Sequence, residues 1–154
     1  MINVLFVCLG NICRSPMAEA VLRSKIAIAG LQDKITVDSA GTGNWHIGKP
    51  PHEGTRRMLD QYGIDYAGMT ARQIQPEDFG SFDYIVCMDQ SNGENVRKLR
   101  GGDQAELLFF MDLLPDAELR EVPDPYFTGN FEQTYELIEA GCTALLDRIQ
   151  RDLG

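Results

Sequence analysis

The N-terminal apolar run and the loop after it constrain the fold more than any other feature of the sequence. Ile2–Cys8 is almost continuously apolar and rich in valine, leucine and phenylalanine, which is typical of a strand buried on both faces of a parallel sheet. The run stops at Gly10, Pro16 suits the first turn of a helix, and apolar residues recur at roughly helical spacing until Gly30 can end that helix. We therefore expect a strand, a tight loop and a helix.

Three shorter apolar runs predict further strands. They lie at residues 35–37, 82–88 and 105–110. The first of them precedes small and polar residues at 38–43, which predict a turn region.

Helical signals lie between and after these runs. Pro51 can open a second helix that Gly63 ends, and Ser91, with capping-box spacing to Glu94, can begin another that continues through Leu99. A loop punctuated by prolines then leads to a last helix. Its apolar residues repeat at alternating four- and three-residue steps and are expected in the core: Phe131, Tyr135, Ile138, Cys142, Leu145 and Ile149.

Strands that alternate with helices imply a parallel sheet covered on both faces. Right-handed crossovers make the strand order 2-1-3-4 the simplest layout. We predict one α/β domain over residues 1–154, a flavodoxin-like three-layer sandwich with a four-stranded parallel sheet. A chain of 154 residues is long enough to bury about 70% of its unfolded surface.

Composition and charge exclude several classes of protein. With 44% hydrophobic and 24% charged residues, the chain has an ordinary globular composition. Lysine and arginine number 14 against 23 aspartates and glutamates, and the net charge of −9 argues against nucleic acid or an anionic membrane as a partner. No apolar stretch approaches the roughly 18 residues of a membrane span, and no basic segment precedes the first apolar run, so we expect a cytoplasmic protein.

The cysteines indicate free thiols. Their irregular spacing does not match the disulfide framework of a small secreted domain. A zinc site is not expected either, because there is no CxxC motif and both histidines, His46 and His52, lie far along the chain from the first two cysteines. We therefore expect no metal or other cofactor. The four cysteines are Cys8, Cys13, Cys87 and Cys142.

The loop at residues 8–15 is the expected ligand site. In such sheets ligands bind beyond the carboxyl ends of the strands, where the strand order reverses. Five residues separate Cys8 from Arg14, enough chain for backbone amides to surround one anion at the N-terminus of the next helix. These amides and the helix dipole would hold Cys8 as a thiolate nucleophile, and Arg14 could bind two phosphoryl oxygens.

Taken alone, Cys8 and Arg14 could equally be a buried strand-end cysteine and a surface cation. The context favours a phosphate loop because a strand precedes it, a helix follows it, a glycine lies within it and a hydroxyl follows the arginine. Other glycine motifs fail: Gly41-Thr42-Gly43 lacks the third glycine of a dinucleotide-binding motif, and no GxxxxGK occurs.

A cysteine phosphatase also needs a proton donor for the leaving oxygen, and Asp124 is the candidate. Pro123 and Pro125 stiffen the loop on either side of it. An Asp-Pro pair alone is typical of a turn, so the catalytic interpretation of Asp124 depends on the Cys8 loop.

At these residues the sequence resembles the low-molecular-weight protein tyrosine phosphatases, and the resemblance covers the whole chain. The first and last of the matching motifs are highly specific when they occur together. The motifs are Val7-Cys8-Leu9-Gly10-Asn11-Ile12-Cys13-Arg14-Ser15-Pro16, Asp38-Ser39-Ala40-Gly41-Thr42, Ala71-Arg72-Gln73, Cys87-Met88-Asp89 and Asp124-Pro125-Tyr126.

The resemblance implies hydrolysis of phosphotyrosine and aryl phosphates through a cysteinyl-phosphate intermediate. In that mechanism Cys8 is the nucleophile, Arg14 holds the transition state, and Asp124 acts as general acid and then as general base. Ser15 would donate a hydrogen bond to the Cys8 sulfur, and Asn11 would shape the loop.

The resemblance also implies the surroundings of the substrate. Trp45 and Tyr126 match aromatic walls that flank the phosphotyrosine ring. The expected partner is a tyrosine-phosphorylated protein, with a tyrosine kinase as one candidate, and the expected oligomeric state is a monomer. The implied substrate-binding residues are Leu9, Gly10, Asn11, Ile12, Cys13, Ser15, Trp45 and Tyr126.

Three features depart from the family's pattern or vary within it. Phe127 stands where many members carry a second tyrosine, which removes a hydroxyl from the rim of the site. Met69 stands where some members, chiefly animal ones, carry a histidine in the network around Asn11, a network that also includes Ser39. Residues 44–49 belong to the variable stretch that sets partner choice.

Two other functions remain open on the sequence. A thioredoxin-coupled arsenate reductase resembles this family in fold and anion loop but uses two further cysteines; here only Cys87 lies in a plausible region, and Cys142 lies on the apolar stripe of the last helix. A noncatalytic phosphate-binding module would not need Cys8. Phosphate release and arsenate reduction by wild type and Cys8→Ser separate these functions.

A second thiol in the loop predicts redox control. An accessible thiolate is readily oxidised to sulfenic acid, and Cys13 can capture that species as a disulfide with Cys8 before the oxidation becomes irreversible. The resemblance implies the same protective role. The alternative is that Cys13 only packs beneath the loop.

Overall fold

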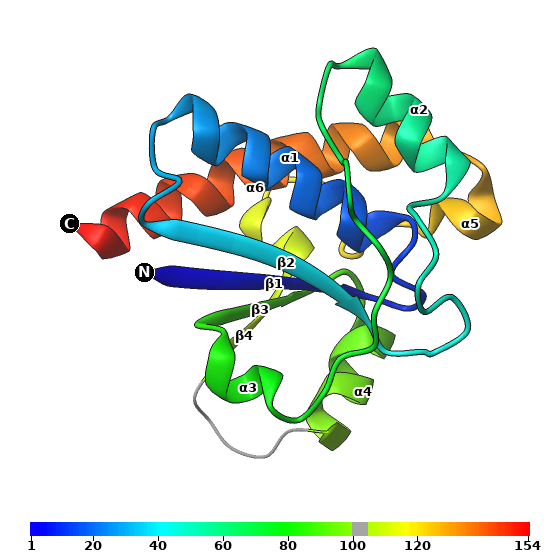
Figure 1. Cartoon of the computed structure of the whole chain (residues 1–154), viewed down its shortest axis with the longest axis horizontal. Coiled ribbons are helices and arrows are strands. Elements are labelled where there is room, and N and C mark those ends of the chain that lie inside the picture. The colour runs from blue at the N-terminus through cyan, green and yellow to red at the C-terminus, as the bar shows by residue number, and fades with distance from the viewer. Residues whose placement is uncertain (100–104) are drawn as a thin grey trace.

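The computed structural model describes residues 1–99 and 105–154, and these residues contain a four-stranded sheet (Figure 1). All three strand pairings are parallel. The strands are β1 (Ile2–Cys8), β2 (Ile35–Gly41), β3 (Tyr84–Cys87) and β4 (Glu106–Phe109), and their order is β2-β1-β3-β4. The predicted α/β class and strand order are confirmed.

Helices cover both faces of the sheet. Figure 1 shows α1, α2 and α6 on one side and α3 and α4 on the other, which gives the predicted three layers. The helices are α1 (Arg14–Ile28), α2 (Glu53–Gln61), α3 (Asp78–Ser81), α4 (Gln90–Leu99), α5 (Pro125–Thr128) and α6 (Phe131–Leu153), with a 3₁₀ helix, η1, at Phe110–Leu113.

The apolar sequence of β1 follows from its central position. Val4 and Phe6 pack in the core under α1 and α6, whereas Leu5 and Val7 pack in a second core on the side of α3 and α4. All four side chains are completely buried. Because successive side chains of a strand face opposite ways, a strand covered on both faces has to be apolar at every position.

The stripe predicted for the last helix is confirmed. At Gly141 a Cβ atom would lie 2.2 Å from the ring of Phe110, so glycine lets α6 approach η1 closely. The buried members of the stripe are Tyr135, Ile138, Cys142, Leu145 and Ile149.

The turn region predicted at residues 38–43 is wrong for its first four residues, which continue β2 to Gly41. They pair in register with the end of β1, from Leu5 opposite Asp38 to Cys8 opposite Gly41. Small and polar residues remain extended here because β1 supplies backbone hydrogen bonds along its whole length.

Several predicted ends also differ from the structure. α4 begins at Gln90, and the Asp89 carboxylate accepts a hydrogen bond from the Asn92 amide at 2.8 Å, so Asp89 rather than Ser91 satisfies the first turn. The second helix begins at Glu53 after an N-cap at His52 rather than at Pro51. The third and fourth strands are shorter than predicted, and three short helices were not predicted at all: α3, η1 and α5.

Within residues 1–99 and 105–154, no helix has both the length and the apolar character needed to cross a bilayer. In the same residues, no group of three or more histidine, cysteine, aspartate or glutamate side chains is arranged to hold a metal ion.

Candidate active site

The loop at residues 8–15 lies at the carboxyl ends of the parallel strands, as predicted (Figure 1). It packs against the end of β2, where the amide of Gly43 donates to the carbonyl of Leu9 at 2.9 Å. A Cβ atom on Gly41 would lie 2.9 Å from the Leu9 carbonyl oxygen and 3.1 Å from the Asn11 nitrogen. Because both are backbone atoms, only glycine allows this close approach.

Asn11 fixes the loop from a left-handed backbone conformation, with φ at 58°. Asparagine tolerates this conformation better than most other side chains. Its buried Nδ2 donates to Ser15 Oγ at 2.8 Å and to Ser39 Oγ at 2.9 Å. Its Oδ1 accepts from the amide of Arg72 at 2.9 Å. The side chain therefore ties the loop to α1, to β2 and to the segment after α2.

Seven amides of the loop have no protein acceptor in the part of the chain that the structure describes. They are the N–H groups of Leu9, Gly10, Asn11, Ile12, Cys13, Arg14 and Ser15. The last two open α1, whose first turn has no intrahelical acceptor. Amides free in this way at a helix N-terminus favour an anionic ligand.

A chain of hydrogen bonds links the sulfur of Cys8 to a buried carboxylate. Cys8 Sγ lies 2.9 Å from Ser15 Oγ, and Ser39 Oγ donates to Glu19 Oε1 at 2.6 Å. Because a carboxylate only accepts, Ser39 donates to Glu19 and accepts from Asn11. Asn11 also donates to Ser15, which leaves the Ser15 proton for the sulfur of Cys8.

Glu19 anchors this chain from inside α1, where its side chain is buried. Burial raises the pKa of Glu19, while the hydrogen bond from Ser39 and the charge of Arg23 act in the opposite direction. Arg23 forms an ion pair with Glu19 one helical turn away and also donates to the Val37 carbonyl at 3.1 Å.

Arg14 is buried to 2% exposure, so it is not a surface cation. Its Nη1 donates to Asp89 Oδ2 at 2.8 Å and to the Val122 carbonyl at 2.9 Å, and its Nη2 lies 3.4 Å from Asp124 Oδ2. Its Nε is buried and has no partner among the described residues. Burial lowers the pKa of Arg14, but the charges of Cys8, Asp89 and Asp124 outweigh burial and raise it.

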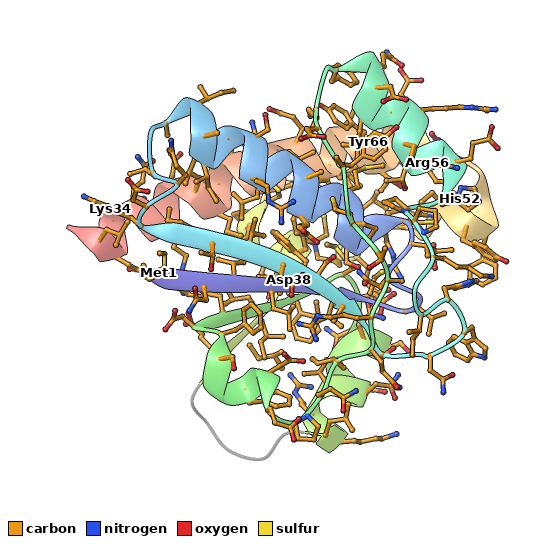
Figure 2. The ribbon with its side chains drawn as sticks, viewed as in Figure 1. Met1, Lys34, Asp38, His52, Arg56 and Tyr66 are labelled. Carbon is orange, nitrogen blue, oxygen red and sulfur yellow. The ribbon has the colours of Figure 1, made fainter. Side chains whose placement is uncertain are left out.

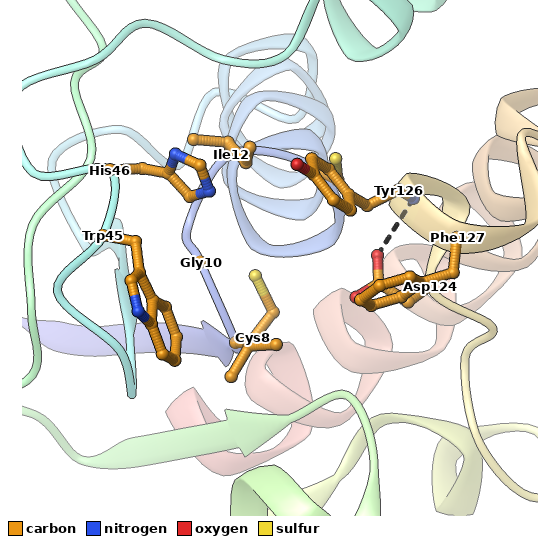
Figure 3. A pocket seen from close by; sticks show the side chains of 10 residues that line it. Cys8, Gly10, Ile12, Trp45, His46, Asp124, Tyr126 and Phe127 are labelled. Carbon is orange, nitrogen blue, oxygen red and sulfur yellow. Dashed lines mark hydrogen bonds between the residues drawn. The ribbon is translucent and has the colours of Figure 1, made fainter.

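Asp124 is held as the N-cap of α5. Its Oδ1 accepts from the Tyr126 amide at 3.1 Å, the contact drawn as a dashed line in Figure 3. Pro125 follows as the buried first residue of the helix. The cap and the contact with Arg14 therefore orient the carboxylate, in addition to the stiffness predicted from the prolines.

A cavity of about 390 Å³ opens at Cys8 (Figure 3). Three exposed aromatic side chains, Trp45, Tyr126 and Phe127, contribute to its wall. Of the predicted site residues, Asn11, Arg14 and Ser15 are buried and do not line it. The lining consists of Cys8, Leu9, Gly10, Ile12, Cys13, Trp45, His46, Asp124, Tyr126 and Phe127.

His46 is a lining residue that the sequence analysis missed. A Cβ atom on Gly10 would lie 2.9 Å from His46 Cδ2, so the glycine leaves room for the imidazole. The ring lies 6.2 Å from that of Tyr126, and its Nδ1 is buried with no partner among the described residues. No local pattern marks this histidine, because its contacts come from distant segments.

The other three cysteines are buried thiols. Burial, with a further contribution from the charge of Cys8, raises the pKa of Cys13 to about 12. Burial raises the pKa of Cys87 to about 12 and also raises that of Cys142. Cys13 lines the cavity at Cys8, whereas Cys87 and Cys142 are completely buried and do not line it.

Comparison with known proteins gives consistent matches. The family profile described as low molecular weight phosphotyrosine protein phosphatase matches residues 3–154. The low molecular weight protein-tyrosine-phosphatase YfkJ of Bacillus subtilis is 52% identical over 153 residues, which cover 99% of this chain and 98% of that protein. The low molecular weight protein-tyrosine-phosphatase PtpA of Staphylococcus epidermidis is 46% identical over 152 residues, covering 99% and 96%.

Solved structures agree with these matches. The crystal structure of Bacillus subtilis YfkJ superposes with a TM-score of 0.96 and covers 99% of this chain and 96% of that one. The crystal structure of DARP, a Drosophila arginine phosphatase, is 34% identical and superposes with a TM-score of 0.86, covering 95% and 96%.

Proposed function

Because the chain belongs to the low-molecular-weight phosphotyrosine protein phosphatase family, we propose that it hydrolyses phosphotyrosine with Cys8 as nucleophile, Arg14 as phosphoryl clamp and Asp124 as proton donor. Membership of the family implies phosphotyrosine hydrolysis through a cysteine nucleophile. The observation that supports these residue roles is the hydrogen-bond chain that directs the Ser15 hydroxyl at the sulfur of Cys8. Cys8 itself lies in the wall of a cavity that exposed aromatic residues also line.

In the first step the Cys8 thiolate attacks phosphorus. The S–P bond forms while the P–O bond to the tyrosine ring breaks, and Asp124 gives its proton to the departing phenolate oxygen. The hydroxyl of Ser15 stabilises the negative sulfur.

The phosphoryl oxygens are held by the loop amides that lack a protein acceptor and by one edge of Arg14. Asp89 and Val122 occupy Nη1 of Arg14. Among the described residues, Nε has no partner and Nη2 has only the 3.4 Å contact with Asp124. Nε and Nη2 form the planar fork that binds two phosphoryl oxygens at once.

In the second step a water molecule attacks the cysteinyl phosphate. Asp124, now a carboxylate, accepts the proton of that water, the S–P bond breaks, and Cys8 leaves as a thiolate. The products are inorganic phosphate and the enzyme in its starting state.

The exposed rings of Trp45, Tyr126 and Phe127 suit an aromatic substrate. A phenol ring held between aromatic walls gains apolar contact area while its phosphate extends to the loop. Phe127 supports this contact although it lacks the hydroxyl of tyrosine. The substrates are therefore tyrosine-phosphorylated proteins, and a tyrosine kinase is one candidate to be sought by capture with the Cys8→Ser protein.

The deciding experiment measures release of inorganic phosphate from a phosphotyrosine peptide. Cys8→Ser should lose turnover while thermal unfolding stays close to wild type, because serine fills similar space but is a much weaker nucleophile. Arg14→Lys should be severely impaired because an ammonium group cannot reproduce the planar fork. Near-wild-type turnover by Cys8→Ser would refute the assignment.

Parallel substrates separate the other functions. A phosphoarginine peptide and arsenate with a thiol reductant are assayed beside the phosphotyrosine peptide. Cleavage of phosphotyrosine alone supports the proposal, and a preference for either of the others contradicts it. Cys87 and Cys142, both completely buried, do not favour a reductase relay.

The role of Asp124 is tested with two leaving groups. Asp124→Asn should slow formation of the phosphoenzyme strongly from an alkyl phosphate and weakly from a nitrophenyl phosphate, because only the poor leaving group needs a proton. Equal slowing of both substrates would mean that another group is the general acid.

A further inference from the structure

A second groove adjoins the active-site cavity on the side of α2. Its volume is about 380 Å³, and Ile12, His46 and Tyr126 line both the groove and the cavity. The rest of the groove is lined by residues 49–53 and Arg56. Because three side chains border both spaces, a chain attached to a ligand in the cavity can continue directly into the groove.

The wall of the groove is fixed relative to the loop that holds Cys8. The amide of His52 donates to the carbonyl of Ile12 at 2.7 Å, and the amide of Ala71 donates to the carbonyl of Lys49 at 2.8 Å. The His52 ring caps α2 by accepting from the amide of Gly54 at 3.0 Å. Lys49 and the start of α2 therefore hold a set position beside the cavity.

The groove contains two cationic side chains that form no ion pair with any described residue. Neither Lys49 nor Arg56 forms an ion pair within residues 1–99 and 105–154, and the buried Nε of Arg56 has no hydrogen-bond partner there. The one carboxylate in the lining, that of Glu53, is paired with Arg57 at 2.6 Å.

In the part of the chain that the structure describes, the nearby carboxylate of Asp60 forms no ion pair with Arg56. It lies one helical turn beyond Arg56 and accepts a hydrogen bond from the Tyr66 hydroxyl at 3.1 Å. Figure 2 shows Arg56 and His52 at the end of the molecule opposite Lys34. In a chain with a net charge of −9, two cations left unpaired beside the cavity indicate an anionic ligand.

We propose that this groove binds an acidic side chain of the substrate, so that the enzyme prefers phosphotyrosine flanked on one side by aspartate or glutamate. The inference rests on the proposed function, because the phosphotyrosine in the cavity is what delivers the neighbouring residues to the groove. Lys49 and Arg56 attract the acidic side chain. The peptide backbone passes over Ile12 and Tyr126, which border both the cavity that holds the phosphotyrosine and the groove that holds the acidic side chain.

The test uses a set of phosphotyrosine peptides that each carry a single glutamate at one of the three positions on either side, and the matching glutamine peptides. For wild type, kcat/KM should be about fivefold higher for glutamate than for glutamine on one side of the phosphotyrosine only, as expected for partly exposed ion pairs. The preference should shrink as salt rises from about 0.05 M to about 0.5 M.

Two double variants identify the residues responsible. In the Lys49→Met, Arg56→Met protein, the ratio of kcat/KM for the glutamate peptide to kcat/KM for the glutamine peptide should be close to one. A general loss of activity lowers both values equally and leaves this ratio unchanged. The matched control is Lys34→Met with Arg151→Met, which removes the same charge at two exposed positions outside the groove. Lys34 lies at the opposite end of the molecule in Figure 2, and Arg151 lies in the last turn of α6. The control should retain the wild-type ratio.

The outcomes separate this inference from the proposed function. If none of the peptides is cleaved, the proposed function fails. If glutamate and glutamine peptides are cleaved equally at every position, or if the preference survives in the Lys49→Met, Arg56→Met protein, the groove inference is overturned while the phosphatase assignment stands.

Discussion

The hydrogen bonds of Asn11 allow a quantitative test of how the loop is held. This buried side chain makes three hydrogen bonds, with Ser15, Ser39 and the amide of Arg72. Its backbone has φ at 58°, in the left-handed region. Replacement by alanine removes the bonds and places a residue with a Cβ atom in that conformation, whereas replacement by glycine removes the bonds without this backbone strain.

The expected magnitudes follow from these contacts. Each buried hydrogen bond contributes about 1 kcal/mol net, so both variants should lose about 3 kcal/mol of unfolding free energy through the missing side chain. Alanine should lose about 1–2 kcal/mol more because its Cβ disfavours the left-handed region. Glycine avoids that strain but gives the unfolded chain more freedom, which costs about 0.5–1 kcal/mol. Asn11→Ala should therefore be less stable than Asn11→Gly by about 1 kcal/mol.

Urea unfolding of wild type and the two variants, followed by circular dichroism, measures these differences. Asn44→Ala is the control, because Asn44 is exposed and makes no hydrogen bond within the described residues. The three hydrogen bonds should together contribute about 3 kcal/mol of unfolding free energy. If both Asn11 variants lose less than about 1 kcal/mol, which is the contribution of a single bond, the view that this side chain holds the loop is refuted. A glycine variant less stable than the alanine variant would refute the argument from backbone conformation.

Three further changes test neighbouring parts of the site. Gly41→Ala should cost about 1–3 kcal/mol in urea unfolding, because its Cβ meets backbone atoms that cannot move, whereas Gly80→Ala, where a Cβ has open space, should not destabilise. The pKa of Glu19 is raised in the folded protein, so ionisation of this side chain weakens the fold as pH rises above about 4.5. The unfolding free energy of wild type should therefore fall relative to that of Glu19→Gln between pH 4.5 and neutrality. A difference between the two proteins that does not change with pH would contradict this. After peroxide and then reductant, Cys13→Ser should recover a smaller fraction of its own starting activity than wild type; equal recovery without a Cys8–Cys13 crosslink in the mass spectrum would exclude protection by Cys13.

The sequence predicted those parts of the fold that depend on local patterns. β1 is apolar at each position from Val4 to Val7, because Val4 and Phe6 face one core while Leu5 and Val7 face the other, and that property is visible in a single segment. The stripe of α6 is visible in the same way. The position of the loop at residues 8–15 then followed from the strand and helix that flank it.

The parts that could not be predicted depend on contacts between distant segments. Residues 38–41 extend β2 only because β1 pairs with them. The clamp role proposed for Arg14 is suggested by its motif, but the groups that anchor it, Asp89 and the Val122 carbonyl, lie in two separate loops. Glu19 looks like an ordinary helix residue until Ser39 is placed beside it.

The distribution of charge explains how so acidic a chain could bind a phosphate. Long-range attraction cannot gather the ligand when the net charge is −9. In the proposed mechanism, Asp89 and the Val122 carbonyl fix Arg14 through Nη1, so the guanidinium keeps its charge and orientation while its other edge faces the phosphoryl group. The carboxylates around the site therefore orient the guanidinium as well as opposing the ligand. In that mechanism their arrangement favours a tightly localised dianion over a diffuse acidic surface, and the proposed groove cations, Lys49 and Arg56, would add a second local contribution to the choice among phosphorylated partners.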